Sequence, residues 1–195
     1  MENRINKEEL LEILREWNRF LRRKVHMIAC GGTAMTLAGA KASTKDVDFM
    51  VPVLEEHRYL IGKLGELGYR PVTTSVWQRT GELFRFDLFK GNNIHTTRLL
   101  ESPLEDEGHT LVIEYSRLYI GLLNDYDLIV SKLMRGTRVD YEDCLTLAEA
   151  RADKLDIIKL IEHFNEMISY DISQDRLGPN IEYFVDRLKA KGLYG

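Results

Sequence analysis

Residues 25–38 read VHMIACGGTAMTLA, and this segment decides the fold. The apolar run 25–30 predicts a short strand, and the glycine pair Gly31-Gly32 predicts a tight turn directly after it. Thr33 supplies a hydroxyl at the cap position and good helix formers follow it, so a short helix is expected next. The segment therefore predicts a strand, a turn and a helix in immediate succession.

Downstream, residues 46–51 read DVDFMV, and their alternation of acidic and apolar residues is typical of a strand. Asp46 and Asp48 project from the same face, where their mutual repulsion is unfavourable unless water or a cation screens it. A second D-x-D pair, Asp125 and Asp127, lies in the first turn of a predicted helix, where the helix dipole favours acids. We therefore interpret the first pair as a candidate site and the second as helix capping. A solvated strand edge is the alternative for the first pair.

Periodicity and turn residues divide the chain into an α/β domain over residues 1–124 and a helical C-terminal region over residues 125–195, expected to pack on it. Asn6, followed three residues later by Glu9, is a capping-box start for the first helix. The stretch 91–108 is expected to be mostly loop, and Gly178-Pro179 is expected to separate the last two helices. The other predicted elements are helices over 6–23, 54–67, 125–134, 140–150, 154–169 and 180–191, and strands over 72–78, 82–90, 94–99, 111–115 and 118–123.

The composition is that of a soluble globular protein: 195 residues, a formal charge of −4, 44% hydrophobic and 30% charged residues. Its apolar runs are shorter than the roughly 18 residues of a membrane span, and its start lacks a signal-peptide pattern. We therefore expect a cytoplasmic protein with no membrane partner. The acidic net charge gives no general attraction to nucleic acid. Cys30 and Cys144 lie in predicted regular elements, which favours buried core residues over a disulfide or a thiolate metal site.

A third carboxylate, Asp87, lies on the predicted strand 82–90, and a mixed sheet can bring it beside the first two. The turn Gly31-Gly32-Thr33 offers backbone N–H groups and a hydroxyl that can hold a phosphate. Three converging carboxylates near such a turn meet the requirement of a two-Mg²⁺ phosphoryl-transfer site, because the metals neutralise the acids and bind the attacking and leaving oxygens. A surface pair of Arg85 and Asp87 explains the third acid equally well.

The order of these residues resembles the nucleotidyltransferase superfamily, which has the polymerase-beta-like fold. Its signature is a Gly-Gly or Gly-Ser turn, then D-x-D, then a third carboxylate; here Gly31-Gly32-Thr33 precedes Asp46-Val47-Asp48 by twelve residues, and Asp87 follows. The resemblance covers about residues 25–150. It implies an α/β (α+β) fold with a short mixed β-sheet flanked by helices. It also implies transfer of a nucleoside monophosphate from an NTP to an acceptor by residues 1–124.

The resemblance also implies a role for each residue of the signature. Asp46, Asp48 and Asp87 are expected to hold two Mg²⁺ ions, for which Mn²⁺ can substitute. Asp87 is also placed to accept the proton of the acceptor. Gly31, Gly32 and Thr33 are expected to bind the phosphates of the nucleotide.

A second stretch, from Asp127 through Lys132 and Arg135 to Asp143, is similar to a prokaryotic group of the superfamily that includes abortive-infection toxins of toxin-antitoxin systems. In that group a helix lysine binds nucleotide phosphates, so the resemblance implies that Lys132 and Arg135 bind the triphosphate. It also implies a tRNA or protein acceptor and an antitoxin partner. For Asp140 and Asp143 we favour the alternative that they are acids at a helix N-terminus, where the helix dipole stabilises them without any function.

The main prediction is a metal-dependent nucleotidyltransferase that acts on an RNA, protein or small-molecule acceptor. One alternative is a catalytically weak nucleotidyltransferase-like domain with a binding or regulatory role. Another is a metal-dependent phosphodiesterase that uses the same carboxylates, although the sequence lacks hydrolase signatures rich in His and Asp. The sequence also lacks the P-loop and the G-x-G-x-x-G motif, which disfavours P-loop NTPases and dinucleotide-binding proteins.

Overall fold

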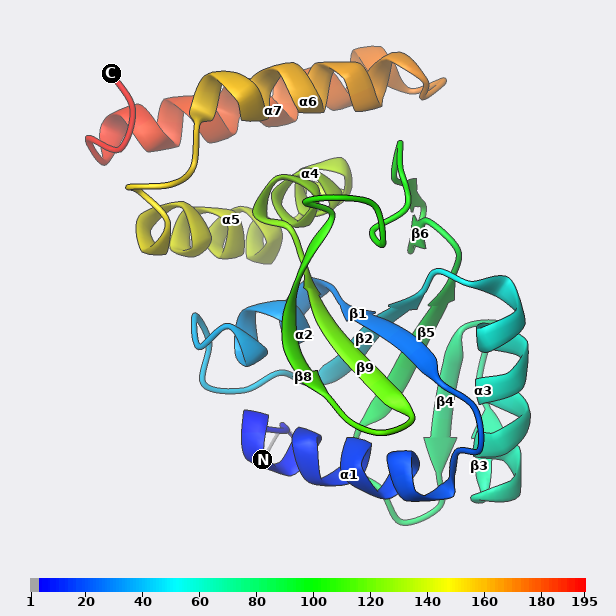
Figure 1. Ribbon diagram of the computed structural model, residues 1–195. Coiled ribbons are helices and arrows are strands. Elements are labelled where there is room, and N and C mark those ends of the chain that lie inside the picture. The colour runs from blue at the N-terminus through cyan, green and yellow to red at the C-terminus, as the bar shows by residue number, and fades with distance from the viewer. Residues whose placement is uncertain (1–3) are drawn as a thin grey trace. The chain divides into compact units, whose positions relative to one another are not determined.

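The computed structural model describes residues 4–195 (Figure 1). Its backbone contacts divide the chain into two compact units, one that ends at Asn124 and one that begins at Asp125. The first unit is built on a seven-stranded sheet with helices, and the second is helical. This confirms the predicted mixed α/β class with a helical C-terminal region.

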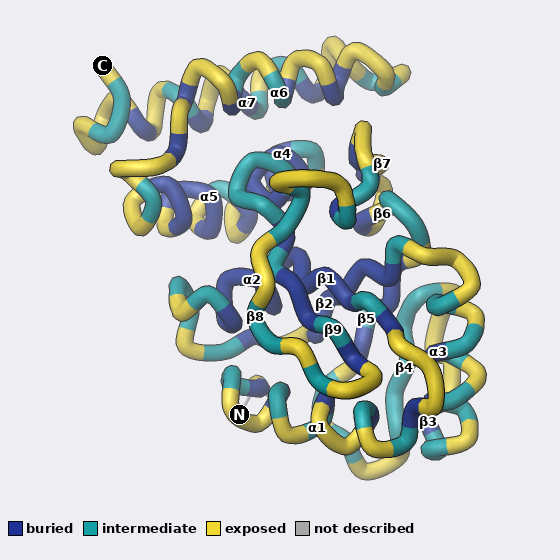
Figure 2. The backbone as a smooth tube through the Cα atoms, viewed as in Figure 1, coloured by how far each residue is buried: buried dark blue, intermediate teal, exposed yellow. Residues whose placement is uncertain are grey.

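The sheet of the first unit runs in the order β3-β4-β5-β2-β1-β9-β8. Two of its strand pairs, β1–β9 and β2–β5, are parallel and the others are antiparallel, so the sheet is mixed, as predicted. The central strands are mostly buried (Figure 2), which is typical of strands covered on both faces. The strands are β1 (Val25–Ala29), β2 (Asp46–Val51), β3 (Tyr69–Pro71), β4 (Val76–Arg79), β5 (Arg85–Lys90), β8 (His109–Glu114) and β9 (Leu118–Leu123).

Three helices belong to this unit: α1 (Lys7–Phe20), α2 (Gly31–Leu37) and α3 (Leu54–Glu66). The predicted capping box is confirmed, because the Asn6 side chain accepts from the Glu9 backbone N–H and the Glu9 carboxylate accepts from that of Asn6. α1 buries an apolar stripe, and its Trp17 ring lies 4.6 Å from that of Phe86 on β5, centroid to centroid. Each fully buried apolar side chain of this kind stabilises the fold by about 1.5–3 kcal/mol.

The second unit consists of α4 (Asp125–Arg135), α5 (Arg138–Ala150), α6 (Ile157–Ser169) and α7 (Gln174–Ala190). The predicted break at Gly178-Pro179 is wrong, because α7 runs through Pro179 and the chain reverses before Gln174 instead. A proline inside a helix costs about 3 kcal/mol or more. Leu177 and Ile181, on either side of it, are buried, and their packing outweighs the local preference for a break.

Two predicted strands also differ from the structure. Only the second part of the predicted strand 72–78 is a strand, because residues 72–75 form a turn that joins β3 to β4. In this turn the Thr73 hydroxyl accepts from the Val76 N–H at 3.2 Å. Hydroxyl side chains that bond the nearby backbone in this way compete with strand pairing. The predicted strand 94–99 is a small pair, β6 (Asn93–Ile94) and β7 (Thr97–Arg98).

The two cysteines are fully buried, which confirms their predicted place in the core. Over residues 4–195, every helix is too short or too polar to cross a bilayer.

Candidate active site

The parallel pairing of β2 with β5 brings two of the predicted site residues together. Asp48 and Asp87 are direct register partners, and Asp46 is the partner of Arg85 one step along the same face. In-register side chains on neighbouring parallel strands project from the same face of the sheet, and the strands lie about 4.8 Å apart. Asp46 is exposed, Asp87 is half-buried and only 7% of Asp48 is accessible. One face of the sheet therefore carries three acids, of which Asp46 is the most exposed and Asp48 the most buried.

The Asp48 carboxylate packs against the start of α2. Gly31 has a φ of +55°, and a Cβ placed there would lie 2.5 Å from Asp48 Oδ2. Any other residue at this position would strain the backbone and displace the carboxylate. Gly31 thus allows β1, α2 and the Asp48 side chain to meet at one point.

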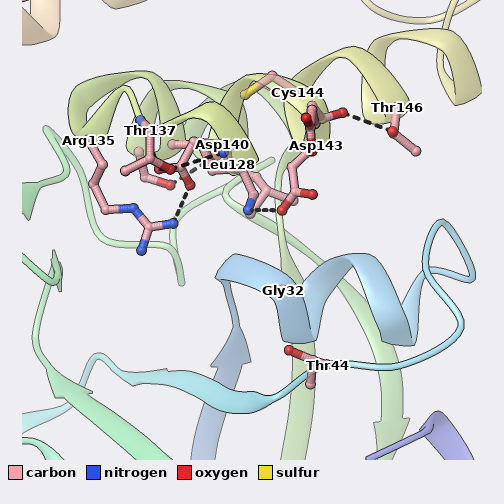
Figure 3. A network of polar contacts seen from close by, with 12 residues as sticks. Gly32, Thr44, Leu128, Arg135, Thr137, Asp140, Asp143, Cys144 and Thr146 are labelled. Atoms are coloured by element: carbon pink, nitrogen blue, oxygen red, sulfur yellow. Dashed lines mark hydrogen bonds and ion pairs between the residues drawn. The ribbon is translucent and has the colours of Figure 1, made fainter. Parts of the chain in front are cut away.

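Gly32 makes a second close approach, to the segment that leads into β2. A Cβ at Gly32 would lie 2.7 Å from Thr44 Oγ1, and Figure 3 shows Thr44 facing this turn of α2. The Thr44 hydroxyl donates to the Asp46 carbonyl at 2.8 Å. The two glycines therefore allow close packing around β2. Their binding of phosphate stays a prediction.

Thr33 is fully buried, and its hydroxyl bonds the backbone of β2. It accepts from the Asp48 N–H at 2.8 Å and donates to the Asp46 carbonyl at 3.3 Å. The N-cap of α2 is Cys30, so Thr33 lies in the first turn of the helix and not at the cap. These bonds fix the spacing between α2 and the D-x-D strand. A contact of Thr33 with nucleotide phosphate stays a prediction.

Asp87 has a partner that sequence reasoning missed. Ser75, in the turn between β3 and β4, donates its hydroxyl to Asp87 Oδ1 at 3.0 Å. The polar run Thr73-Thr74-Ser75 was the available signal, since it lacks the alternation of apolar and polar residues that is typical of a half-buried strand. It indicates a turn but does not reveal which residue the turn contacts.

The donor set of this face suits a hard divalent cation. Within residues 4–195, no three Asp, Glu, His or Cys side chains lie close enough together to hold one ion. Mg²⁺ is usually bound by one or two carboxylates together with waters and substrate phosphates, and Asp48 and Asp87 offer such a pair. The residues fit a metal that is completed by a nucleotide better than a metal held by protein alone.

The predicted basic residues lie in the helical unit, and each is paired with an acid there. Lys132, 2% accessible, donates to Asp143 Oδ2 at 2.7 Å. Arg135 donates to Asp140 Oδ1 at 2.5 Å, and Thr137 donates to Oδ2 of the same carboxylate (Figure 3). Asp140 completes a capping box with Thr137, which confirms the helix N-terminus interpretation for this residue. The binding of nucleotide by Lys132 and Arg135 stays a prediction.

Known structures resemble this chain. The lincosamide antibiotic adenylyltransferase LnuA, in a lincomycin-bound structure, matches with a TM-score of 0.52 and 17% identity over 74% of this chain and 98% of that chain. JHP933 from Helicobacter pylori matches with a TM-score of 0.48 and 13% identity over 96% of each chain. An antigenic nucleotidyltransferase-like protein from Paracoccidioides brasiliensis matches with a TM-score of 0.49 and 12% identity, over 92% of this chain and 95% of that chain. At such identity, the likeness to LnuA shows a shared fold alone.

A search of the curated proteins found no match by sequence. The scan of protein families did find one: residues 8–189 match the family described as "Nucleotidyltransferase of unknown function (DUF6036)". The match spans nearly the whole chain and includes every residue of the predicted site. It confirms the resemblance to nucleotidyltransferases and the prediction of an enzyme that transfers nucleotidyl groups. The chain therefore belongs to this family of nucleotidyltransferases.

Proposed function

We propose that this protein is a divalent-metal-dependent nucleotidyltransferase that moves a nucleoside monophosphate from an NTP to an acceptor. The observation that supports the proposal is the register of β2 and β5, in which Asp48 and Asp87 are direct partners and project from the same face of the sheet. Two adjacent acids repel each other, and a cation between them removes that cost. Such clusters of charge are concentrated at functional sites.

The residues of the sheet face then take distinct roles. Asp48, held against Gly31, and Asp87, on the neighbouring strand, hold Mg²⁺ or Mn²⁺ together with the nucleotide phosphates, and Asp46 extends this set toward solvent. A bound divalent cation would stabilise the charge that develops on the transferred phosphoryl group. Asp87 also accepts the proton of the attacking hydroxyl. Thr33 keeps α2 aligned with β2.

The experiment is transfer of labelled nucleotide, with each of the four NTPs, to total RNA, to total protein and to a panel of small hydroxylated molecules. Wild-type protein should transfer label with Mg²⁺ or Mn²⁺ and not with a chelator. Asp46→Asn should fold normally, because Asp46 is exposed, and should lose about 10³-fold in rate. That loss corresponds to about 4 kcal/mol of transition-state stabilisation.

The matched control is Asp106→Asn, which removes an exposed acid from a loop of the same unit. It should keep the wild-type rate. A metal-dependent Asp46→Asn protein with full activity would overturn the assignment of the D-x-D pair.

A binding or regulatory domain with weak turnover is the second candidate. Two observations favour it: the described residues bring no three potential metal ligands together, and Lys132 and Arg135 are both engaged in ion pairs. Under this alternative, NTP and Mg²⁺ raise the unfolding temperature, but no label reaches any acceptor. Ligand at about 100 times its dissociation constant stabilises the folded state by about 2.7 kcal/mol.

The acceptor is proposed to be tRNA or protein, in line with the similarity of residues 127–143 to abortive-infection toxins. A toxin should arrest growth of its host when it is induced, and Asp46→Asn should not. A small regulatory protein that binds the chain and restores growth would then be the antitoxin. Label found only on small molecules would replace this acceptor class with the small-molecule one.

A further inference from the structure

Ser75 contacts β5 through both its backbone and its side chain. Its carbonyl accepts from the Leu88 N–H at 2.9 Å, and its hydroxyl donates to Asp87 Oδ1 at 3.0 Å. The two contacts are therefore made with Asp87 itself and with the next residue of β5. Ser75 is thus attached to β5 at the residue that the proposed mechanism uses.

The turn that carries Ser75 is held by its own hydrogen bonds. The Val72 N–H donates to the Val76 carbonyl at 2.8 Å, and the Thr73 hydroxyl accepts from the Val76 N–H at 3.2 Å. Val76 is in turn the register partner of Asp87 in the antiparallel β4–β5 pair. Ser75 is half-buried, whereas the neighbouring Thr74 is exposed. The hydroxyl is therefore presented to Asp87 by a fixed backbone.

The position of Asp87 explains why such a bond is useful. Asp48 lies beside it in register, and repulsion between the two carboxylates favours rotation of the more accessible one away from the other. A hydroxyl donated to Oδ1 opposes that rotation and leaves Oδ2 available. A neutral donor does this without cancelling the negative charge that a cation requires, as lysine or arginine would.

We propose that Ser75 is a positioning residue that orients the Asp87 carboxylate for binding of the divalent cation and the NTP. This inference rests on the proposed function. Hydrogen-bond partners of metal-binding groups commonly contribute 10- to 100-fold in metal affinity or activity. Loss of the hydroxyl should therefore weaken the site without removing it.

The test compares Ser75→Ala, Ser75→Thr and the control Thr74→Ala in the full chain. Ser75→Ala should raise the concentration of Mn²⁺ needed for half-maximal transfer about 10- to 100-fold. Ser75→Thr should need a Mn²⁺ concentration close to that of wild type, because threonine keeps the hydroxyl. Thr74→Ala should match wild type, since Thr74 is exposed and its side chain makes no hydrogen bond within residues 4–195. Binding of Mn²⁺ in the presence of a non-hydrolysable NTP, followed by electron paramagnetic resonance, should show the same order of affinities.

Introducing Ser75→Ala into the Asp87→Asn protein separates positioning of Asp87 from a merely structural role of Ser75. If Ser75 acts through Asp87, then Ser75→Ala adds little to the loss that Asp87→Asn already causes. Losses that multiply, or a Ser75→Ala protein that matches Thr74→Ala, would overturn the inference. If wild type transfers no label, the proposed function fails, and Mn²⁺ affinity alone decides the role of Ser75. Equal Mn²⁺ affinity of wild type and Ser75→Ala, or none in either, overturns that role too.

Discussion

The acids of the two units have different neighbours. In the helical unit, Asp143 and Asp140 each accept from a cation of the same unit, Lys132 and Arg135. On the sheet face, Asp87 lies beside Asp48 and receives only the neutral hydroxyl of Ser75 as a hydrogen-bond donor among the contacts of the described residues. Removing the acid of a buried ion pair leaves an uncompensated charge and destabilises the fold, whereas removing one of two adjacent acids relieves repulsion. The comparison predicts that the same substitution will have different consequences in the two units.

The largest effect on folding is expected from Asp143→Asn. The substitution keeps the shape of the side chain but leaves the Lys132 ammonium buried, with 2% exposure and no opposite charge on its hydrogen-bond partner. Breaking one partner of a buried ion pair costs about 3–5 kcal/mol. Urea unfolding followed by circular dichroism measures this as a lower midpoint.

The matched variant is Asp87→Asn, which removes one of two adjacent acids. It should leave the urea midpoint unchanged or higher, because it relieves repulsion, and it should strongly lower the rate of transfer. If Asp143→Asn unfolds at the wild-type midpoint, the pair is dispensable for folding. That outcome would favour the predicted binding of nucleotide by Lys132.

Local patterns in the sequence predict the elements on which both sets of acids lie. The alternation of residues 46–51 and the spacing of apolar residues in α1, α4 and α6 follow directly from the geometry of strands and helices. The first-turn position of Asp125 and Asp127 in α4 is also confirmed.

Contacts between separate elements were less predictable from the sequence. The parallel register of Asp48 with Asp87 joins distant segments, the Ser75 bond depends on a turn, and Asp143 meets Lys132 from another helix. None of these contacts has a periodic signature. Pro179 was misjudged for a related reason, because tertiary packing overrides local helix preference.

A second, smaller effect sharpens the comparison at Gly31. Gly31→Ala places a Cβ in the left-handed region and 2.5 Å from Asp48 Oδ2. The backbone strain costs about 1–2 kcal/mol. Displacement of a reacting group by about 1 Å lowers the rate roughly 10²-fold. Unfolding free energy and the rate of labelled transfer should therefore both fall.

Gly39→Ala is the control, because Gly39 has a φ of +79° but open space where its Cβ would lie. It should lose a similar amount of stability and keep its transfer rate. Equal rates for the two variants would mean that the close contact between Gly31 and Asp48 does not position the acid.

The smallest effect concerns a cation that titrates. His163 Nε2 lies 2.7 Å from Asp127 Oδ1 in the helical unit, and this hydrogen bond raises the pKa of His163 above its usual 6.5. A raised pKa in the folded state means that the pair contributes its stability at pH below about 6.5, and that the contribution is lost as pH rises through the folded pKa. In urea unfolding, Asp127→Asn should therefore lower the free energy of unfolding by about 1 kcal/mol more at pH 5.5 than at pH 8.5.

Asp125→Asn offers a pH-independent reference, since the partner of Asp125 is Arg151, which stays charged throughout this range. If both variants respond to pH alike, the charge on His163 contributes nothing to the fold, and the rule that acids of this unit are stabilised by their cations fails at Asp127.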